Sequence, residues 1–230
     1  MSFRFRDRAQ AGRFLADKLE SCAGEPAAVV LGLPRGGVPV AAEIANHLGA
    51  RLDIFLVRKV GAPGQAELAL GAIASGGVII LNHAVIADLR VSPRELETLI
   101  ARAQTELRAL ENHYRPADHA ANLRGRLIIL VDDGLATGAT MRAAVAAVRE
   151  RQPARIVVAV PVAARDVVEQ FRTAADEFVC VQTPPDFRGV GQFYEDFSQT
   201  SDEEVRRLLA RAIQPRQPIP AASGASSFGF

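Results

Sequence analysis

The sequence predicts an α/β protein with a mostly parallel sheet and helices on both faces. Short, continuous apolar runs recur along the chain and are bounded by proline, glycine or charged residues, as buried strands are. Between these runs lie stretches with apolar residues at helical spacing. Strands that alternate with amphipathic helices form parallel sheets whose two faces are both covered. No internal repeat is present.

In the first third of the chain, turn and capping signals separate the expected elements. In chain order these elements are a helix after Asp7, a strand at 27–33, a helix that ends at Gly49, a strand at 52–57, a mobile loop at 60–70, and a hairpin of 71–74 with 78–81. Asp7 and Gln10 have the spacing of a capping box, which places the helix start. The loop is expected at 60–70 because that segment contains two glycines and a proline.

The remaining elements are a long helix and a second strand-helix series. They are a helix from Ser92 to Tyr114, a strand at 127–131, a helix over 141–148, a strand at 156–160, a helix at 164–174, a strand at 178–181 and a helix after Ser201. The long helix begins with a cap and a proline and keeps one apolar stripe for about six turns. We expect a single domain over 1–213 with a helical insertion at about 84–122, a small hood at about 182–200, and a disordered tail at 214–230.

The composition gives no reason to expect nucleic acid or a membrane as the main partner. The chain has 230 residues, 49% of them apolar, and 27 basic and 26 acidic residues give a net charge of +1. Its apolar runs are far shorter than the ~18–20 residues of a membrane-spanning helix. No apolar stretch follows the N-terminal charges, so we expect a cytoplasmic protein. Cys22 and Cys180 are expected to be reduced, buried or half-buried thiols.

The segment LIILVDDGLATGATM carries the chemistry of the chain. A buried strand delivers Asp132 and Asp133 at its carboxyl end, where ligands bind in parallel sheets. Gly134 and Gly138 allow a tight turn and a close approach to a ligand. The amides and hydroxyls of residues 136–140 can surround a phosphate at a helix N-terminus. A ribose 5-phosphate needs both features, because its phosphate takes amides and its hydroxyls take carboxylates. The alternative is a strand-to-helix turn whose acids cap the helix.

This loop resembles the phosphoribosyl-pyrophosphate (PRPP) signature of type I phosphoribosyltransferases. The resemblance implies their Rossmann-like fold, and it covers residues 27–160 by order of parts. It places Asp132 and Asp133 at the ribose as catalytic residues. The implied 5-phosphate-binding residues are Ala136, Thr137, Gly138, Ala139 and Thr140. A Walker A loop is excluded because no Gly-Lys-Ser/Thr follows. Most of the chain also resembles a group of bacterial predicted phosphoribosyltransferases whose substrate is unassigned.

Two further segments resemble the pyrophosphate-binding parts of the family. In LGLPRGGVP, Arg35 can bind phosphate oxygens, and Gly36 and Gly37 leave room for the diphosphate. An ordinary Pro-x-Gly-Gly turn is the alternative. In related enzymes a basic residue at the end of the second strand also contacts pyrophosphate, and the loop after it closes over the site. Lys59 is the candidate here, as one of only two lysines, and Arg58 competes with it because strand alternation points one of them to each face.

In type I phosphoribosyltransferases a variable segment called the hood builds the acceptor pocket. The resemblance therefore implies an acceptor pocket at about residues 182–200 of this chain. Phe187, Phe193 and Tyr194 are candidates for stacking on a flat acceptor ring. The alternative is that these aromatic residues anchor the segment to the core. Family members that use 6-oxopurines usually carry an acid immediately before the Thr-Gly of the loop, whereas this chain has Ala136, as adenine-type members do. Hypoxanthine and guanine are therefore poorer candidates, and the acceptor stays open.

Together these features predict transfer of ribose 5-phosphate from PRPP to a small nitrogenous acceptor with release of pyrophosphate. Mg²⁺ is the expected cofactor, carried by PRPP near Asp132 and Asp133 rather than held in a protein metal site. The long amphipathic insertion offers a surface for a homo-oligomer. The alternative function is a PRPP-binding regulatory or interaction module that performs no transfer. A sugar-phosphate phosphohydrolase is a weaker alternative, because the sequence shows no nucleophile or metal constellation for it.

Overall fold

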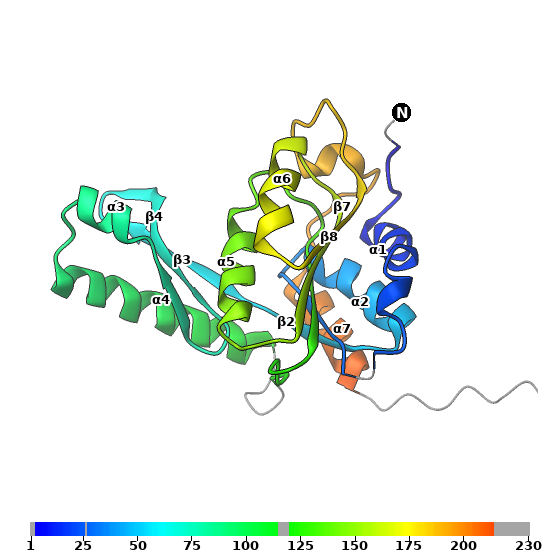
Figure 1. Cartoon of the computed structure of the whole chain (residues 1–230), viewed down its shortest axis with the longest axis horizontal. Coiled ribbons are helices and arrows are strands. Elements are labelled where there is room, and N and C mark those ends of the chain that lie inside the picture. Colours follow the sequence, from blue (N-terminus) through cyan, green and yellow to red (C-terminus); the bar gives the residue numbers. More distant parts are fainter. Residues whose placement is uncertain (1–2, 26, 115–119, 214–230) are drawn as a thin grey trace, which may run out of the picture.

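The structure, a computed structural model, describes residues 3–25, 27–114 and 120–213 (Figure 1). A five-stranded parallel sheet with helices on both faces forms the body, and an arm of antiparallel strands and two helices projects from it. The predicted α/β fold is confirmed. The tail predicted to be disordered, 214–230, lies outside the described residues. Among the helices of the described part, none has the length and apolar character needed to cross a membrane.

The main sheet has the strand order β2-β1-β6-β7-β8, and every neighbouring pair is parallel. Its strands are β1 (Val29–Gly32), β2 (Arg51–Ile54), β6 (Leu127–Val131), β7 (Arg155–Val162) and β8 (Glu177–Gln182). All residues of β1 and β6 are buried. These strands lie in the middle of the covered sheet, and this position explains why they are continuous apolar runs in the sequence.

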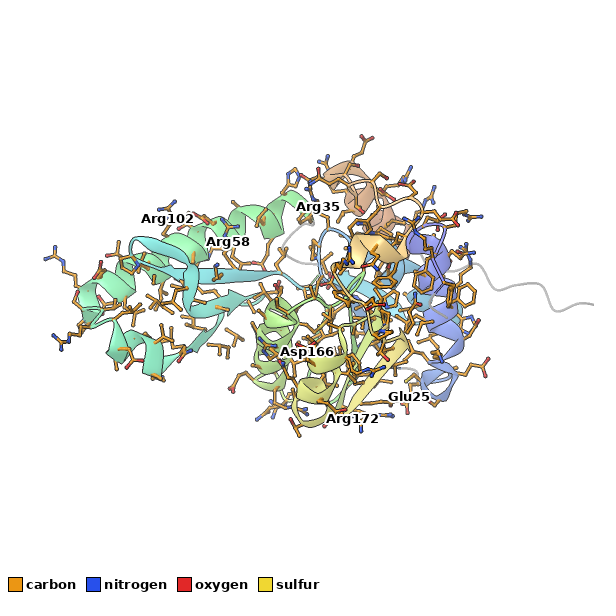
Figure 2. All side chains as sticks on the ribbon, turned by 90° about the horizontal axis from the view of Figure 1, so that it is seen from above. Glu25, Arg35, Arg58, Arg102, Asp166 and Arg172 are labelled. Carbon is orange, nitrogen blue, oxygen red and sulfur yellow. The ribbon has the colours of Figure 1, made fainter. Side chains whose placement is uncertain are left out.

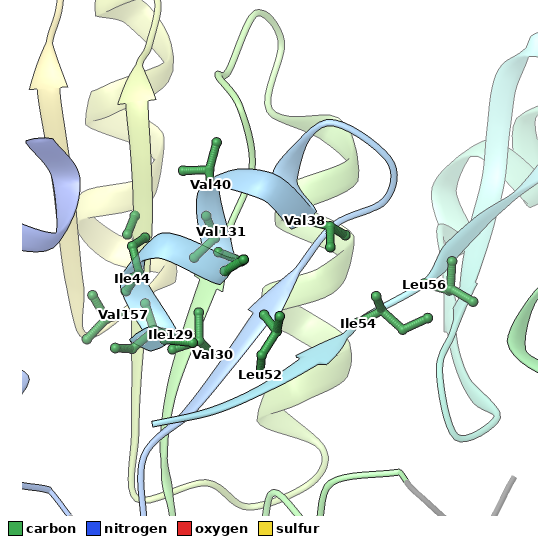
Figure 3. Packing of buried hydrophobic residues seen from close by; sticks show 14 of the residues in the cluster. Val30, Val38, Val40, Ile44, Leu52, Ile54, Leu56, Ile129, Val131 and Val157 are labelled. Carbon is green, nitrogen blue, oxygen red and sulfur yellow. The ribbon is translucent and has the colours of Figure 1, made fainter. Parts of the chain in front are cut away.

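Helices pack on both faces of this sheet (Figure 1). Helices α1 (Arg8–Asp17), α2 (Gly37–Leu48) and α7 (Asp202–Ile213) lie on one face, and α5 (Ala139–Arg149) and α6 (Arg165–Ala174) lie on the other. Alternate strand residues point to opposite faces, so the interior is divided into two hydrophobic clusters. Figure 3 shows the first of them, in which Val30 and Ile129 of the sheet pack against Ile44 of α2.

Side-chain caps start α1, α4 (Pro93–Tyr114) and α7 where the sequence predicts them. The capping bonds run from Gln10 N to Asp7 Oδ1 (2.7 Å), from Glu95 N to Ser92 Oγ (3.3 Å) and from Glu204 N to Ser201 Oγ (3.1 Å). Each satisfies an amide that the first turn leaves without a helical partner. Gly49 ends α2 in the left-handed conformation, with φ +69°. The described residues also form the 3-10 turns η1 (Glu20–Cys22) and η3 (Val190–Phe193).

The arm corrects the predicted loop at 60–70. This segment belongs to a long hairpin of β3 (Val57–Ala62) and β4 (Gln65–Ala74), and β5 (Val78–Leu81) adds a third antiparallel strand. Pro63 and Gly64 form only the turn, in which Gly64 has φ +69°. Pro63 and Gly64 were therefore correct signals of a turn, whereas Gly61 lies within β3 at an irregularity of the pairing, and the residues on both sides of the turn extend the two strands.

Helix α4 (Pro93–Tyr114) covers one face of the arm sheet, and α3 (His83–Asp88) precedes it. Ala103 and Leu107 of α4 are buried in the same hydrophobic cluster as Val60 and Leu70 of the arm strands. At the base of the arm, the Tyr114 hydroxyl donates a hydrogen bond to Asp202 of α7 (2.7 Å). The expected helical insertion at about 84–122 therefore continues the arm that begins at β3, and the domain boundaries themselves stay a prediction.

Two glycines with the same backbone angle allow the packing around the start of α5 to be tested. Gly125 and Gly138 both have φ +67°, but a Cβ on Gly125 would meet nothing within 4 Å, whereas one on Gly138 would lie 2.8 Å from Phe171 and 2.9 Å from Val167. We expect Gly125→Ala to lower the free energy of unfolding by about 1 kcal/mol through backbone strain alone. Gly138→Ala should cost about 1–3 kcal/mol more because of overpacking. Urea unfolding of both variants checks this, and equal losses would contradict it.

Candidate functional site

Two loops meet at the carboxyl edge of the main sheet, because the strands that lead into them are neighbours. β1 pairs in parallel with β6, with Gly32 opposite Val131, so the loops that lead into α2 and α5 start side by side. The Leu33 N–H donates to the Val131 carbonyl across them (2.9 Å). The peptide bond between Pro34 and Arg35 is cis. This edge is where parallel sheets bind ligands.

The glycines of the first loop lie directly against the acids of the second. A Cβ on Gly36 would overlap Oδ2 of Asp133, and one on Gly37 would be 2.5 Å from the Val131 carbonyl oxygen and 2.9 Å from Cα of Asp132. No residue with a side chain fits there without moving the acids or the strand end. The structure therefore joins the two loops that resemble the pyrophosphate and PRPP segments into one site.

The acid pair is only partly exposed, and its two negative charges lie close together. The Asp133 N–H donates to Oδ1 of Asp132 (2.9 Å). Burial raises the pKa of Asp132 well above its usual value, and the neighbouring charge of Asp133 raises it further. Burial also raises the pKa of Asp133, although a hydrogen bond from Arg8 and its charge act in the opposite direction. A cation or hydroxyl donors placed beside this pair would relieve the cost of its ionisation.

Beyond the acids, the loop is fixed at its ends and exposed in its middle. The Leu135 N–H donates to the Val162 carbonyl (2.9 Å), and Arg142 donates to the Thr137 carbonyl (2.8 Å). Ala136 and Thr137 are exposed. The N-cap of α5 is Gly138, which has no side chain with which to bind the first-turn amides. Ala139 and Thr140 are exposed in that first turn, so this end of α5 is suited to an anion.

The predicted basic residues lie in two different places. Arg35 belongs to the glycine loop, and its guanidinium lies 3.7 Å from Asp202 of α7, with about a third of the side chain exposed. Arg58 and Lys59 instead lie on β3 in the arm, and Figure 2 shows Arg58 apart from Arg35. Arg58 donates to Glu106 of α4 (2.8 Å), so it faces that helix and alternation points Lys59 to the other face of the sheet.

Two of the three predicted acceptor-stacking residues are buried, which corrects that prediction. Phe193 and Tyr194 are 2% and 1% exposed and pack in a small core with Phe5 and Val162. Their rings therefore have no face available to a ligand. Phe187 is half-buried and stacks on Phe193, with ring centroids 5.5 Å apart, and its role stays a prediction. The alternative reading of these aromatics, as anchors of the terminal segment, is correct for the first two.

Arg8 and Tyr194 contact the acid pair, and sequence reasoning gave neither this role. Arg8 donates through Nε to Oδ2 of Asp133 (2.8 Å), and the Tyr194 hydroxyl donates to the Asp133 carbonyl (2.7 Å). They lie 125 and 61 residues from Asp133 in the chain. The only signal in the sequence was a set of aromatic residues near both ends, which could have indicated that the ends pack together.

The remaining features lie away from this edge. A cavity of about 400 Å³ is lined by residues that include Asp53, Phe55 and Arg151, and by none of the predicted site residues. Within the described part of the chain, no group of three or more His, Cys, Asp or Glu side chains could hold a metal ion.

Comparisons with known proteins agree with this geometry. The profile of the phosphoribosyl transferase domain matches residues 6–198. Two Mycobacterium tuberculosis proteins, each named "Putative phosphoribosyl transferase", are 45% identical over 208 residues, or 90% of this chain. The chain spans about half (47%) of their length. The bifunctional protein PyrR of Chloroflexus aurantiacus is 33% identical over 132 residues, which are 55% of this chain and 65% of that protein.

The crystal structure of the protein TT1426 from Thermus thermophilus matches with a TM-score of 0.80 and 47% identity. The match covers 91% of this chain and 99% of that chain, so the arm and the body are both shared. The matched family span includes both loops that meet at the acid pair. The chain therefore belongs to the phosphoribosyl transferase domain family.

Proposed function

We propose that this protein transfers ribose 5-phosphate from PRPP to a small nitrogenous acceptor and releases pyrophosphate. One observation carries the proposal: a glycine loop and an acid-and-amide loop are in direct contact at the carboxyl edge of the sheet. Membership of the family supports phosphoribosyl transfer in general. We propose in addition the donor, the class of the acceptor and the role of each residue.

In this proposal the 5-phosphate binds at the start of α5. The residues concerned are Ala136, Thr137, Gly138, Ala139 and Thr140. Their amides and the two hydroxyls would donate to the phosphate oxygens, and the helix dipole would favour the negative charge. The hydrogen bond from Arg142 to the Thr137 carbonyl holds the loop in place before the ligand arrives, which lowers the cost of ordering it.

Asp132 and Asp133 would accept hydrogen bonds from the ribose hydroxyls. They also fit a Mg²⁺ ion carried by PRPP, because Mg²⁺ is usually held by one or two carboxylates together with substrate oxygens and waters. When bound, this ion would neutralise part of the charge on the diphosphate. Arg35 would bind the diphosphate from the opposite loop, and Gly36 and Gly37 would leave room for it because they carry no side chains.

The reaction breaks the bond from C1 of the ribose to the diphosphate as the acceptor nitrogen bonds to C1. Positive charge develops on the ribose ring during this exchange, and the acid pair lies where its negative potential stabilises that charge. Arg35 would stabilise the departing diphosphate. The protein's contribution is then the positioning and charge compensation that two rigid, adjacent strand ends supply.

The packing of the hood restricts where the acceptor can bind, but it does not identify the acceptor. Val190 packs on Gly134, where a Cβ would be 2.6 Å from it, so η3 lies close over the start of the PRPP loop. Phe193 and Tyr194 are buried in the core, whereas the third candidate, Phe187, keeps part of its side chain exposed. We therefore place the nitrogenous acceptor beside Phe187.

Pyrophosphate release from Mg-PRPP tests the function, measured with purines, pyrimidines, pyridine carboxylates and simple amines. Release that depends on one acceptor is the expected result and identifies its class. Release without an acceptor would indicate hydrolysis. No release from a protein whose thermal midpoint rises with Mg-PRPP would favour the non-catalytic binding module. No release and no rise would contradict the PRPP proposal.

The acid pair should matter for turnover more than for folding. In Asp132→Asn, the amide oxygen can still accept the Asp133 N–H, and the buried repulsion between the two acids is removed. We expect turnover to fall at least roughly a hundredfold, with the midpoint of thermal unfolding unchanged or raised. Asp88→Asn, in the exposed α3, is the control and should change neither quantity. Wild-type turnover in Asp132→Asn would refute the assigned role.

Substitutions of the two basic residues on β3 should differ in their effect on the KM for PRPP. Arg58 is paired with Glu106, so Arg58→Gln should leave the KM for PRPP unchanged. Lys59 faces the other side of the strand and is the predicted pyrophosphate contact, so Lys59→Gln should raise that KM by roughly tenfold. Steady-state kinetics with both variants decides between them. The reverse pattern would assign the contact to Arg58, and no effect from either would remove β3 from the site.

A further inference from the structure

Arg8, the first residue of α1, contacts the acid pair from outside the two loops that form the site. Its Nε donates to Oδ2 of Asp133 at 2.8 Å, and the side chains of Arg8 and Asp133 are only 12% and 14% exposed. A charge-assisted hydrogen bond between groups buried to this degree is short, directional and weakly screened. It fixes the Oδ2 oxygen of the Asp133 carboxylate.

The guanidinium of Arg8 is itself fixed by a segment that we call the C-terminal strap, residues 193–198. The guanidinium donates through a terminal nitrogen to the Ser198 carbonyl (2.6 Å). Its central carbon lies 4.1 Å from the centroid of the Phe197 ring. An arginine that stacks on an aromatic face and donates to a carbonyl has few alternative rotamers. The orientation of the Asp133 carboxylate therefore depends, through Arg8, on where the strap lies.

The strap is in turn bound to the N-terminal segment and to the acid loop. Backbone hydrogen bonds join Phe5 N–H to the Phe193 carbonyl (2.8 Å) and Glu195 N–H to the Phe5 carbonyl (2.7 Å). The Tyr194 hydroxyl donates to the Asp133 carbonyl (2.7 Å). Asp133 is thus held at two points, at its backbone by Tyr194 of the strap and at its carboxylate by Arg8.

We propose that Arg8 is a positioning residue of the PRPP site, which sets the orientation of the Asp133 carboxylate and couples it to the C-terminal strap. The inference rests on the proposed function and adds a residue and a mechanical link to it. Because Oδ2 of Asp133 also lies where a Cβ of Gly36 would be, turning this carboxylate would disturb both loops of the site at once. Arg8 acts through Asp133 and is not itself assigned a contact with the substrate.

The test is a double-mutant cycle on the affinity for Mg-PRPP, measured by calorimetry on the full chain. Arg8→Gln should weaken binding by roughly tenfold or more, because one partner of a buried charged pair is lost. Arg8→Lys, which keeps the charge, should recover part of the loss. In an Asp133→Asn background, Arg8→Gln should have little further effect, since the two residues act as a unit. Arg13→Gln is the matched control, because Arg13 lies on the same helix and pairs with Glu43 at an exposed site.

A second readout follows the coupling without any ligand. Amide hydrogen exchange at Glu195 and Asp196 should become faster in Arg8→Gln and stay unchanged in Arg13→Gln. Affinity in Arg8→Gln equal to that of the wild type would overturn the proposal. So would additive losses in the double variant, which would mean that Arg8 acts elsewhere than through Asp133. If the wild-type protein itself does not bind Mg-PRPP, the proposed function fails, and the positioning role fails with it.

Discussion

The closeness of two backbones at the carboxyl edge of the sheet is the constraint on which the site depends. β1 and β6 are adjacent and parallel, so their loops leave the sheet at one point. Gly36 and Gly37 permit the contact, because a Cβ on either would collide with Asp133 or with the end of β6. A ligand that reaches one loop is then within reach of the other, which is what a sugar carrying phosphates at two positions requires.

Placing Asp132 and Asp133 side by side at this edge has an electrostatic cost, which Arg8 partly offsets. Two adjacent carboxylates are largely removed from solvent, and this burial raises the pKa of both. Arg8 compensates one of them and is held by the C-terminal strap, residues 193–198. The N-terminal helix and residues 193–198 therefore support the acid loop, although they lie far from it in sequence. In the liganded state, hydroxyl donors and a Mg²⁺ ion brought by PRPP would compensate the pair further.

The sequence predicted the parts of the fold that local chemistry determines. The buried strands are continuous apolar runs, and the caps at Asp7 and Ser201 start their helices as expected. The arm was missed at 60–70 because glycine and proline mark a turn without giving the length of its strands. The burial of Tyr194 and the pairing of Arg8 with Asp133 depend on contacts between segments far apart in the sequence, and no local pattern encodes such contacts.

A crystal structure of the protein with Mg-PRPP would test the central claim most directly, which is that the two adjacent loops form a single PRPP site. The account predicts the 5-phosphate at residues 136–140, the ribose hydroxyls at Asp132 and Asp133, and the diphosphate over Gly36 and Gly37. PRPP bound away from this edge, for example in the 400 Å³ cavity beside Asp53, would contradict the account.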